Sequence, residues 1–533
     1  MSKSVEMAEM PWGLRGEDGS GNQDDYALAR VGKKPILKRQ FGFMSILGFS
    51  CTILATWEGI LSTFTMPFEN GGPAGTIYSF IIVWAGICAT FITMSELVSM
   101  APTSGGQYHW VSMLSPPSCQ KYMSFVTGWL IVIGWLGAFA SSAYLSSSQI
   151  QGLIVLDHSS YVAQPWHTLL LYWAVTAFTV FVNVFASSLL PKFEGLVLVI
   201  HIIGFFAILI PLVYLGERNS AKEVFTTFSN GGGWQTEGLS FLIGMTGNMF
   251  AFTGADAAVH MSEEIQNSAV VVPICIMTTV VLNGLLGLGM IMAALFTMTD
   301  VEAALNSSTG YPFMEIFLSA TKSVPGSTVM SALIPILVVA TAVGCLASSS
   351  RMVWSFARDR GMPGSSWLSK VSSQAVPQYA ISVVTGVGAL LGLIILGSSA
   401  VLNDVVSLTV SALYGSYLLC AALFLYNRLM GNISSPADPS SDSDVVVNTP
   451  GAPLVWGPFR LPPVLGVICN VCAVVYLTVG IFFSFWPSDR QTTSEAMNYA
   501  VVGTAGTLIL STIYYFLYAK RVYTGPVVEI DRT

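Results

Sequence analysis

The sequence predicts an all-α integral membrane protein with twelve transmembrane helices. Of its 533 residues, 53% are hydrophobic and only 10% are charged, and the mean hydropathy is +0.66. Soluble domains carry about a quarter of charged residues, so this chain has too little polar surface to fold as a soluble globule. It also contains twelve apolar runs, each of roughly 20 residues, which is the length that crosses a bilayer as a helix.

The predicted spans follow one another along the chain, and polar segments separate them into regions. The spans cover about residues 42–66, 76–100, 123–150, 166–188, 191–215, 238–262, 272–298, 327–357, 378–397, 402–427, 461–486 and 497–519. Residues 1–40 lack the early apolar stretch of a signal peptide and are expected to form a disordered cytoplasmic tail. Residues 428–460 contain a Ser-, Pro- and Asp-rich stretch that predicts a disordered cytoplasmic linker. This linker separates a ten-helix core at 41–427 from two accessory helices at 461–519, and residues 520–533 form a second cytoplasmic tail.

The basic residues predict how the chain is oriented. If both termini lie in the cytoplasm, 18 of the 22 Lys and Arg residues fall on that side, and Arg218, Lys222, Lys322 and Arg490 fall on the other. This distribution satisfies the positive-inside rule. We therefore expect cytoplasmic termini and a location in the plasma membrane. The sequon at Asn306 then lies in an outer loop, where it can be glycosylated.

Two spans are interrupted by polar segments that contain glycine. Span 1 carries residues 56–60 and span 6 carries residues 252–256, and Gly59 and Gly254 lie at nearly the same depth from the starts of their spans. Successive spans cross the membrane in alternating directions. Span 6 is the fifth span after span 1, which is an odd number, so the two run in opposite directions. This pattern predicts two inverted repeats, at about 41–215 and 238–427, with broken helices 1 and 6.

Broken helices point to a binding site for a small molecule. The second half of such a helix exposes amide N–H groups, and the first half exposes carbonyls. Two adjacent breaks therefore offer donors to a carboxylate and acceptors to an amine. The alternative is that the glycines only permit close helix packing. The residues expected to bind substrate are Thr56, Trp57, Glu58, Gly59, Ile60, Phe252, Thr253, Gly254, Ala255 and Asp256, together with Trp135 on span 3 as a pocket wall.

Three ionisable residues lie deep in predicted spans, where such groups are functional candidates. Glu58 and Asp256 can each pair with a substrate amine, exchange a proton, or serve as structural acids. His201 on span 5 can titrate near neutral pH, so it can carry a proton or act as a fixed positive group in place of a coupling cation. The alternative is a hydrogen-bonded core histidine. We expect proton coupling at Glu58 and His201.

A second group of charges lies at the cytoplasmic ends of two spans. Glu263 and Glu264 end span 6, and Arg351 and Arg358 on span 8 are seven residues apart and share a helix face. We expect a carboxylate–arginine pair to form an inner gate, with Glu264 and Arg358 as the pair to test. The alternative is that these groups are separately solvated helix ends.

The sequence contains no catalytic triad, metal-ligand cluster or phosphate-binding loop. We therefore expect no enzymatic activity, no cofactor, no metal and no nucleic-acid partner. The predicted partners are a small amine or amino acid, a coupling proton and the lipid bilayer.

Several motifs resemble one family of membrane proteins. They are residues 96–108 (ELVSMAPTSGGQY), the span 6 segment from Phe252 to Asn267, residues 348–363 (SSSRMVWSFARDRGMP) and residues 457–461 (GPFRL). With these motifs the chain resembles the amino acid–polyamine–organocation superfamily over about residues 41–520. The Trp57-Glu58-Gly59 break is similar to that of its fungal amino acid, GABA and choline permeases.

The resemblance implies a LeuT-like core of spans 1–10 that binds substrate between spans 1, 3, 6 and 8. It implies a secondary active transporter for GABA-like or neutral amino acids or related amines, coupled to protons. A choline or quaternary amine permease and a non-transporting nutrient sensor are the alternatives. The sequence departs from the family at two positions: His201 stands where a lysine is frequent, and Gly59 stands where other members have two or three glycines.

Overall fold

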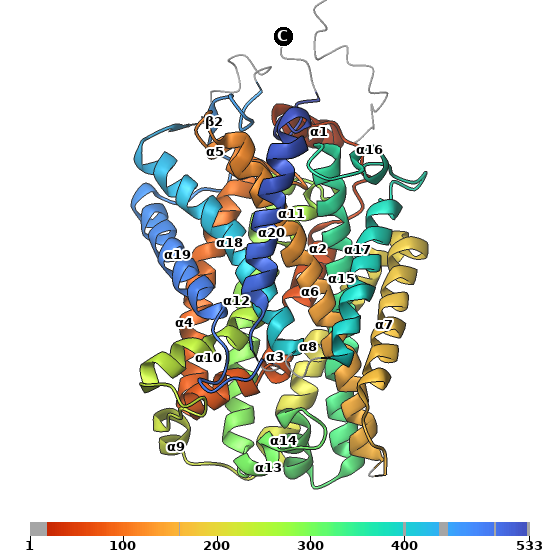
Figure 1. Ribbon diagram of the computed structural model, residues 1–533, viewed down its shortest axis with the longest axis vertical. Helices are drawn as coiled ribbons and strands as arrows, with labels where there is room; N and C mark the ends of the chain where they lie inside the picture. Colours follow the sequence, from red (N-terminus) through yellow and green to blue (C-terminus); the bar gives the residue numbers. More distant parts are fainter. Residues whose placement is uncertain (1–18, 159, 398–400, 436–445, 495–496, 530–533) are drawn as a thin grey trace, which may run out of the picture.

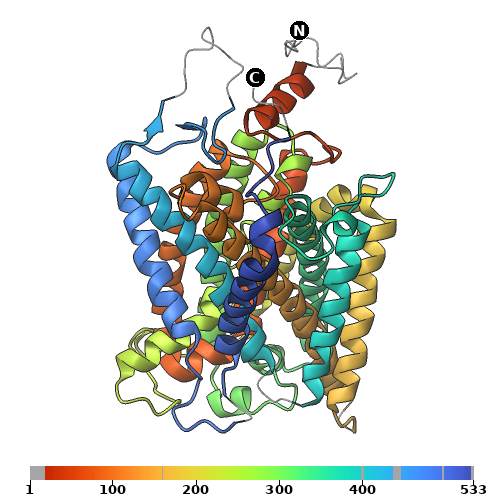
Figure 2. The ribbon, with the colours of Figure 1, turned by 45° about the horizontal axis from the view of Figure 1, so that its top comes forward.

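The computed structural model describes residues 19–158, 160–397, 401–435, 446–494 and 497–529. Most of these residues lie in long helices that run side by side (Figure 1). Helix α1 (Gly19–Arg30) and the last described residues lie together at one end of the bundle (Figure 2), which we call the terminal face. The other end, which we call the opposite face, carries α9 (Ala221–Thr226), α13 (Val301–Leu305) and α14 (Pro312–Thr321).

Eleven helical segments in the described residues are long and apolar enough to cross a membrane, which confirms a multi-pass membrane protein. They are α2 (Phe43–Leu54) with α3 (Thr56–Ser62), α4 (Thr65–Met100), α6 (Gln120–Asp157), α7 (Pro165–Phe185), η2 (Ser187–Leu189) with α8 (Leu190–Leu215), α12 (Ser268–Thr297), α15 (Val324–Arg358), α17 (Gln378–Leu391) with η4 (Gly392–Leu396), α18 (Val401–Leu429), α19 (Pro463–Ser484), and α20 (Ala500–Tyr514) with η5 (Tyr515–Ala519) and α21 (Lys520–Val522). The predicted sixth span is divided into α10 (Glu237–Ala251) and α11 (Ala257–His260), and η3 (Ser262–Glu264) follows. Neither part is long enough to span alone, which is why the count is eleven rather than the predicted twelve.

The interruption in the first span lies at a different residue from the predicted one. Ala55 adopts a left-handed conformation (φ 39°, ψ 47°) that ends α2, and α3 begins at the next residue. Residues 56–60 are therefore helical, and Gly59 does not break the helix. A methyl group at Gly59 would lie 3.1 Å from the Cβ atom of Ala251, so this glycine permits α3 to approach α10 closely. Gly254, in contrast, does lie in the second break, with φ +112°.

Short elements cover the terminal face. Helices α5 (Gln107–Leu114) and α16 (Ser365–Leu368) lie there with α1, and the short strands β1 (Ile433–Ser434) and β2 (Leu454–Val455) pair in parallel. Leu28, Val31 and Leu37 are buried. Asn448 donates a hydrogen bond of 2.8 Å to the carbonyl of Met100. Residues 27–40 and 446–460 are therefore packed, although residues 1–40 were predicted to form a disordered tail. The Ser-, Pro- and Asp-rich stretch that predicts a disordered linker lies mostly outside the described residues, at 436–445, as do residues 1–18.

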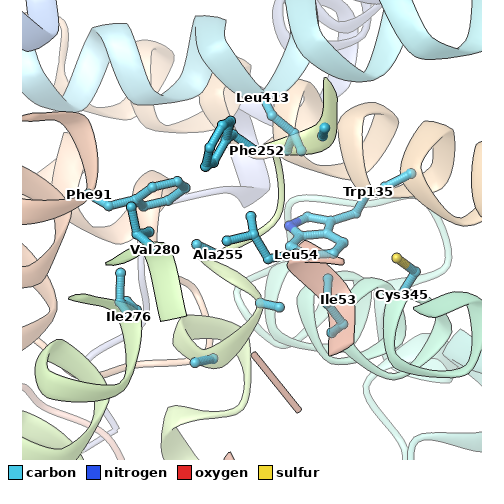
Figure 3. Packing of buried hydrophobic residues seen from close by; sticks show 14 of the residues in the cluster. Ile53, Leu54, Phe91, Trp135, Phe252, Ala255, Ile276, Val280, Cys345 and Leu413 are labelled. Atoms are coloured by element: carbon cyan, nitrogen blue, oxygen red, sulfur yellow. The ribbon is translucent and has the colours of Figure 1, made fainter. Parts of the chain in front are cut away.

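Apolar packing holds the two interrupted helices in place. Leu54 and Ala255 lie close to each other beside the breaks, with Ile53 and Trp135 next to them (Figure 3). Phe252 packs against Phe80, with the ring centroids 5.0 Å apart. Because this packing fixes where each helix ends, the exposed backbone groups at both breaks have defined positions.

Candidate functional site

The two breaks lie next to each other and border a central cavity. The Thr63 hydroxyl donates to the Gly247 carbonyl across 3.1 Å, joining the helix that follows the first break to the helix that precedes the second. A methyl group at Gly254 would lie 3.1 Å from Ile53 Cγ2. The cavity between these segments has a free volume of about 40 Å³, and α6, α15 and α18 complete its wall. Pockets that hold small ligands are usually several times larger, so this cavity is nearly closed in the present conformation.

Apolar side chains and several hydroxyl groups, rather than charges, line this cavity. The lining residues include Ser62, Ser142, Thr253, Thr341 and Thr409, with Trp135 and Phe250 as the aromatic residues. Among the described lining residues, none carries a carboxylate, an amine or a guanidinium. A charged ligand in this cavity would therefore meet its complementary charge at the helix ends, where exposed N–H groups are partially positive and exposed carbonyls partially negative.

Four of the predicted substrate-binding residues line the cavity: Gly59, Trp135, Thr253 and Gly254. The other seven are Thr56, Trp57, Glu58, Ile60, Phe252, Ala255 and Asp256, and they are buried outside its lining. The Thr56 amide donates to Asn283 Oδ1 across 3.2 Å. Trp57 packs against Phe205, with ring centroids 6.3 Å apart. Residues next to the breaks therefore mostly position the helices.

Asp256 belongs to a buried polar network behind the second break. Its side chain is fully buried, accepts a hydrogen bond of 2.7 Å from Gln107 Nε2, and accepts another from the Tyr417 hydroxyl. His260 Nε2 lies 3.6 Å from the same carboxylate. These contacts tie the break to α5 and α18, so they favour the structural alternative for Asp256.

Glu58 and His201, which the sequence indicated separately, form a direct pair between α3 and α8. His201 Nδ1 lies 2.6 Å from Glu58 Oε1, and each side chain is only 1% exposed. Within the described chain, Glu58 Oε2 and His201 Nε2 have no hydrogen-bond partner. Such a pair can hold one proton between a carboxylate and an imidazole. Since Gly59 lines the cavity, the pair and the cavity share the helix α3.

Two carboxylate–arginine pairs connect the second interrupted helix to α15 at the terminal face. Arg358 binds Glu263 through two hydrogen bonds of 3.0 and 2.9 Å, and Arg351 donates to Glu264 across 2.9 Å. All four side chains are at most 7% exposed. The predicted groups do meet, but Arg358 pairs with Glu263 and not with Glu264. They are also buried, which contradicts the alternative of separately solvated helix ends.

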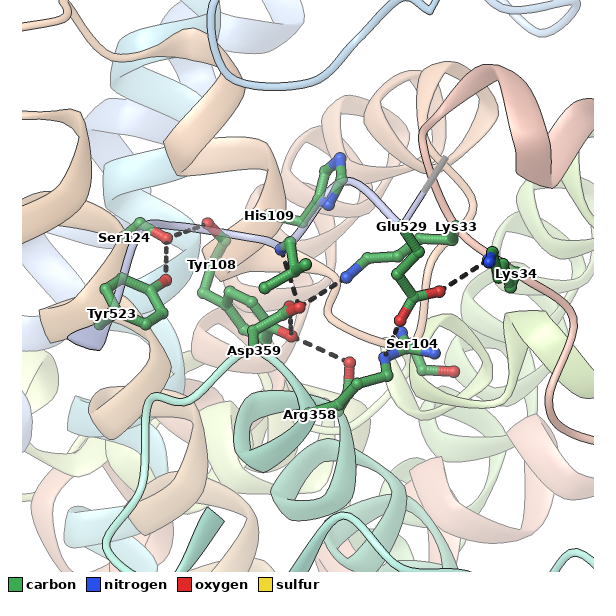
Figure 4. A network of polar contacts seen from close by, with 12 residues as sticks. Lys33, Lys34, Ser104, Tyr108, His109, Ser124, Arg358, Asp359, Tyr523 and Glu529 are labelled. Atoms are coloured by element: carbon green, nitrogen blue, oxygen red, sulfur yellow. Dashed lines mark hydrogen bonds and ion pairs between the residues drawn. The ribbon is translucent and has the colours of Figure 1, made fainter. Parts of the chain in front are cut away.

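A third ion pair in this region was not predicted. Lys33 Nζ lies 2.6 Å from Asp359 Oδ1, and the Tyr108 hydroxyl donates to the other carboxylate oxygen across 2.7 Å (Figure 4). The Val527 amide also donates to Asp359, across 2.9 Å. Two features of the sequence could have indicated this ion pair: the run of basic residues before the first span, and the acidic residue Asp359 directly after Arg358. Because the partners come from distant parts of the chain, the sequence could not pair them.

The electrostatics of this cluster keep its carboxylates ionised. Burial by itself raises the pKa of Asp359, but the charges of Lys33 and Arg358, with hydrogen bonds from Lys33 and the Val527 amide, hold that pKa below its ordinary value of 3.8. Burial also raises the pKa of Glu263, but Arg358, Lys33 and the Ser104 amide hold it below its ordinary 4.5. The terminal face is therefore closed by charged pairs throughout the neutral pH range.

A second cavity lies between the central cavity and the opposite face. It has a volume of about 450 Å³ and is lined by residues that include Gln151, Tyr144 and Tyr311. Ser62 lines both cavities. Ser62 therefore lies between the central cavity and the cavity near the opposite face, whereas buried ion pairs cover the terminal face.

Comparisons with known proteins match most of the chain to one family. The sequence profile of the amino acid permease family matches residues 41–507. A choline transporter of Saccharomyces cerevisiae is 28% identical over 488 residues, which cover 91% of this chain and 82% of that protein. The amino-acid permease BAT1 of Arabidopsis thaliana is 28% identical over 519 residues, covering 94% of this chain and 96% of the relative. A putative amino acid/polyamine transporter of Macrophomina phaseolina is 28% identical over 460 residues, which are 85% of this chain and 96% of the relative.

Proposed function

Because the chain belongs to the amino acid permease family, we propose that it is a secondary active transporter for an amino acid or a related amine. The observation that carries this proposal is the small cavity between two helix breaks, whose described lining residues include five with hydroxyl groups and none with a carboxylate or an amine. Helix ends can match both charges of a zwitterion there, without a fixed side-chain charge. GABA-like and neutral amino acids are therefore the first candidate substrates.

Choline and other quaternary amines are the second candidates, because one relative is a choline transporter. A quaternary ammonium group binds best among several aromatic faces. Trp135 and Phe250 are the aromatic residues among the described cavity lining, and hydroxyls make up more of the wall. This composition supports the amino acid first.

The terminal face is the cytoplasmic side in our proposal, and the membrane is the plasma membrane. The support is the excess of Lys and Arg expected on that side. Asn306, which is exposed at the C-terminal end of α13 on the opposite face, then faces the outside and can carry a glycan.

Transport requires the terminal face to open while the opposite face closes. The pairs Glu263–Arg358, Glu264–Arg351 and Lys33–Asp359 are the inner gate in this proposal, because they join the end of α15 to the second interrupted helix and to the segment before the first span. When they separate, substrate in the central cavity can leave toward the cytoplasm.

Proton coupling is assigned to Glu58 and His201. A proton on this pair alters the attraction between α3 and α8, and Gly59 on α3 lies at the cavity. The proton and the substrate would therefore act on the same short helix, which is the kind of shared element that coupling requires.

Uptake by knockout cells that express the protein tests this proposal. The panel is labelled GABA, neutral amino acids, choline and a polyamine, each measured at two pH values with and without sodium. Uptake of an amino acid that increases at acidic external pH supports the proposal, and preferential uptake of choline would replace the substrate. Failure to take up any compound would favour a nutrient sensor, and sodium dependence would contradict the proton assignment.

A further inference from the structure

A buried carboxylate that the mechanism above does not use lies at the start of α8. Glu194 is fully buried, and neither of its carboxylate oxygens has a hydrogen-bond partner among the described residues. An ionised carboxylate in that position would be unpaired in an apolar environment, which is strongly unfavourable. The packing seen here therefore requires a proton on Glu194.

The surroundings of Glu194 are two helices that border the central cavity. From α2, the Thr52 hydroxyl lies near the carboxylate but outside hydrogen-bonding geometry. From α15, the Cys345 thiol is close enough to sense its charge, and Cys345 lines the cavity. Thr52 and Cys345 are the titratable or polar groups that interact with Glu194 among the described residues, and neither carries a charge. Lys192, two residues earlier on α8, is exposed to the surroundings of the bundle.

Helix α2 covers Glu194 through direct contact with the backbone of α8. A methyl group at Gly48 would lie 2.6 Å from the Glu194 carbonyl oxygen, so the two helices touch without an intervening side chain. Any movement of α2 away from α8 would admit water to this carboxylate. His201 lies seven residues further along the same helix, which is about 10 Å along the axis, so Glu194 and the Glu58–His201 pair are separate sites.

We propose that Glu194 is a second proton-binding site, which holds a proton while α2 packs on α8 and releases it when the helices part. The release is the dissociation of the carboxylic acid into a carboxylate and a proton, and the proton passes to water at the terminal face. Opening of that face then depends on the pH of the compartment it meets. This inference rests on the proposed transport function, in which the terminal face opens during each cycle, and it adds that α2 and α8 part when that face opens.

The test measures opening of the terminal face directly. Cys345 is kept as the single thiol by replacing the other seven cysteines with serine. In inside-out vesicles, a membrane-impermeant thiol reagent is added at the terminal face, and the rate at which it labels Cys345 is measured from about pH 6 to about pH 9. At each pH, this rate is divided by the labelling rate of the Glu194→Gln variant. This ratio cancels the intrinsic pH dependence of the thiol. A direct effect of an ionised Glu194 on Cys345 would disfavour the thiolate and lower the ratio, which is the opposite of the change expected from opening. One coupled proton gives a change of up to about tenfold per pH unit.

The expected result is that the ratio of wild-type to Glu194→Gln labelling rises with pH. Glu194→Met should behave as Glu194→Gln does, and it provides a second neutral variant if the first does not fold. Glu237→Gln, at an exposed position on α10, is the matched control and should follow the wild type. A constant ratio across the pH range overturns the proposal. So does a ratio that follows sodium concentration instead of pH, because the site would then bind a metal cation.

A counterflow experiment separates this inference from the proposed function. At about pH 6 on both sides, where the wild-type carboxyl also keeps its proton, Glu194→Gln proteoliposomes should exchange labelled for unlabelled substrate within about twofold of the wild-type rate. The response of net uptake to the pH at the terminal face should be lost. If the wild type exchanges no member of the substrate panel, the transport proposal fails, and the thiol measurement still decides whether Glu194 binds the proton.

Discussion

Replacing Glu263 with glutamine should open the terminal face. Glu263 receives two hydrogen bonds from Arg358, and a further bond of 3.1 Å from the Ser104 amide. Both partners of the ion pair are at least nine-tenths buried. The variant keeps the shape of the side chain but leaves the Arg358 charge without its main counter-ion.

The size of the effect follows from this burial. Removing one partner of a buried ion pair costs about 3–5 kcal/mol, because the other charge stays desolvated. When the terminal face opens, Arg358 becomes exposed to water and this cost is relieved. Most of the free-energy difference therefore favours the open form of the face. Glu529 lies 3.8 Å from Arg358 and retains part of the attraction, so we take the lower end, about 3 kcal/mol, which corresponds to roughly a hundredfold.

The measurement is the labelling rate of Cys345 by an impermeant reagent from the terminal face, with the other cysteines replaced. Glu263→Gln should increase this rate by roughly a hundredfold. Glu217→Gln is the matched control, because Glu217 pairs with Lys322 at 3.1 Å on the opposite face and both side chains are 73% exposed. A surface pair of this kind contributes about 0–1 kcal/mol, so labelling should not change. If a folded Glu263→Gln protein labels at the wild-type rate, the Glu263–Arg358 pair does not hold the gate.

Four further predictions follow from the geometry. Gly254→Ala should abolish transport and lower the free energy of unfolding by about 1–3 kcal/mol, because φ is +112° and the new methyl group would lie 3.1 Å from Ile53. The control is Gly238→Ala in α10, which has open space around it and should change neither uptake nor thermal unfolding. Burial, together with the charge of Lys33, lowers the pKa of His109 from 6.5 to about 4, so the folded state favours the neutral imidazole. The free energy of unfolding should therefore be constant above about pH 6.5 and fall by roughly 3 kcal/mol as the pH drops toward 4. In a His109→Gln variant, thermal stability should depend less on pH over this range. The pKa values of Asp359 and Glu263 are lowered from 3.8 and 4.5 in the closed face. The stabilisation that these two carboxylates give to the closed face should therefore be lost only as the pH falls below 3.8 and 4.5. In the Glu194→Gln background, the labelling rate of Cys345, corrected with a free thiol, should accordingly not change between about pH 6 and 8. Asn306→Gln should remove a glycan detected as a loss of apparent mass, and an unchanged mass in cells that glycosylate would contradict the outer location of α13.

The membrane spans could be predicted closely because the bilayer fixes both the length and the composition of a spanning helix. The second break could also be predicted, since Gly254 adopts a backbone conformation that favours glycine. The first break could not be located, because Ala55 carries the left-handed conformation that its tertiary surroundings impose. Gly59 looked like the break, but it serves the close approach of α3 to α10.

Pairing was the part of the candidate site that the sequence did not determine. Glu58 and His201 were each indicated by their depth in an apolar span, but their contact depends on how α3 packs against α8. Lys33 and Leu28 lie in a polar segment whose average composition predicts disorder, although a few apolar residues in it are buried against the bundle. A composition argument averages over such residues and therefore misses a short segment that packs.

The closed terminal face also has a consequence for how the protein assembles. Lys33 and Asp359 are 326 residues apart, Val527 and Asp359 are 168 apart, and the hydroxyls of Ser124 and Tyr523 that hydrogen-bond beside them are 399 apart. Contacts with such large sequence separation form late, because the entropy of closing the intervening chain must be overcome first. This face should therefore be the last region to reach its native contacts, after the helices between have inserted. Until then its buried charges have no partners, so incompletely folded chains should expose them to solvent, proteases and chaperones.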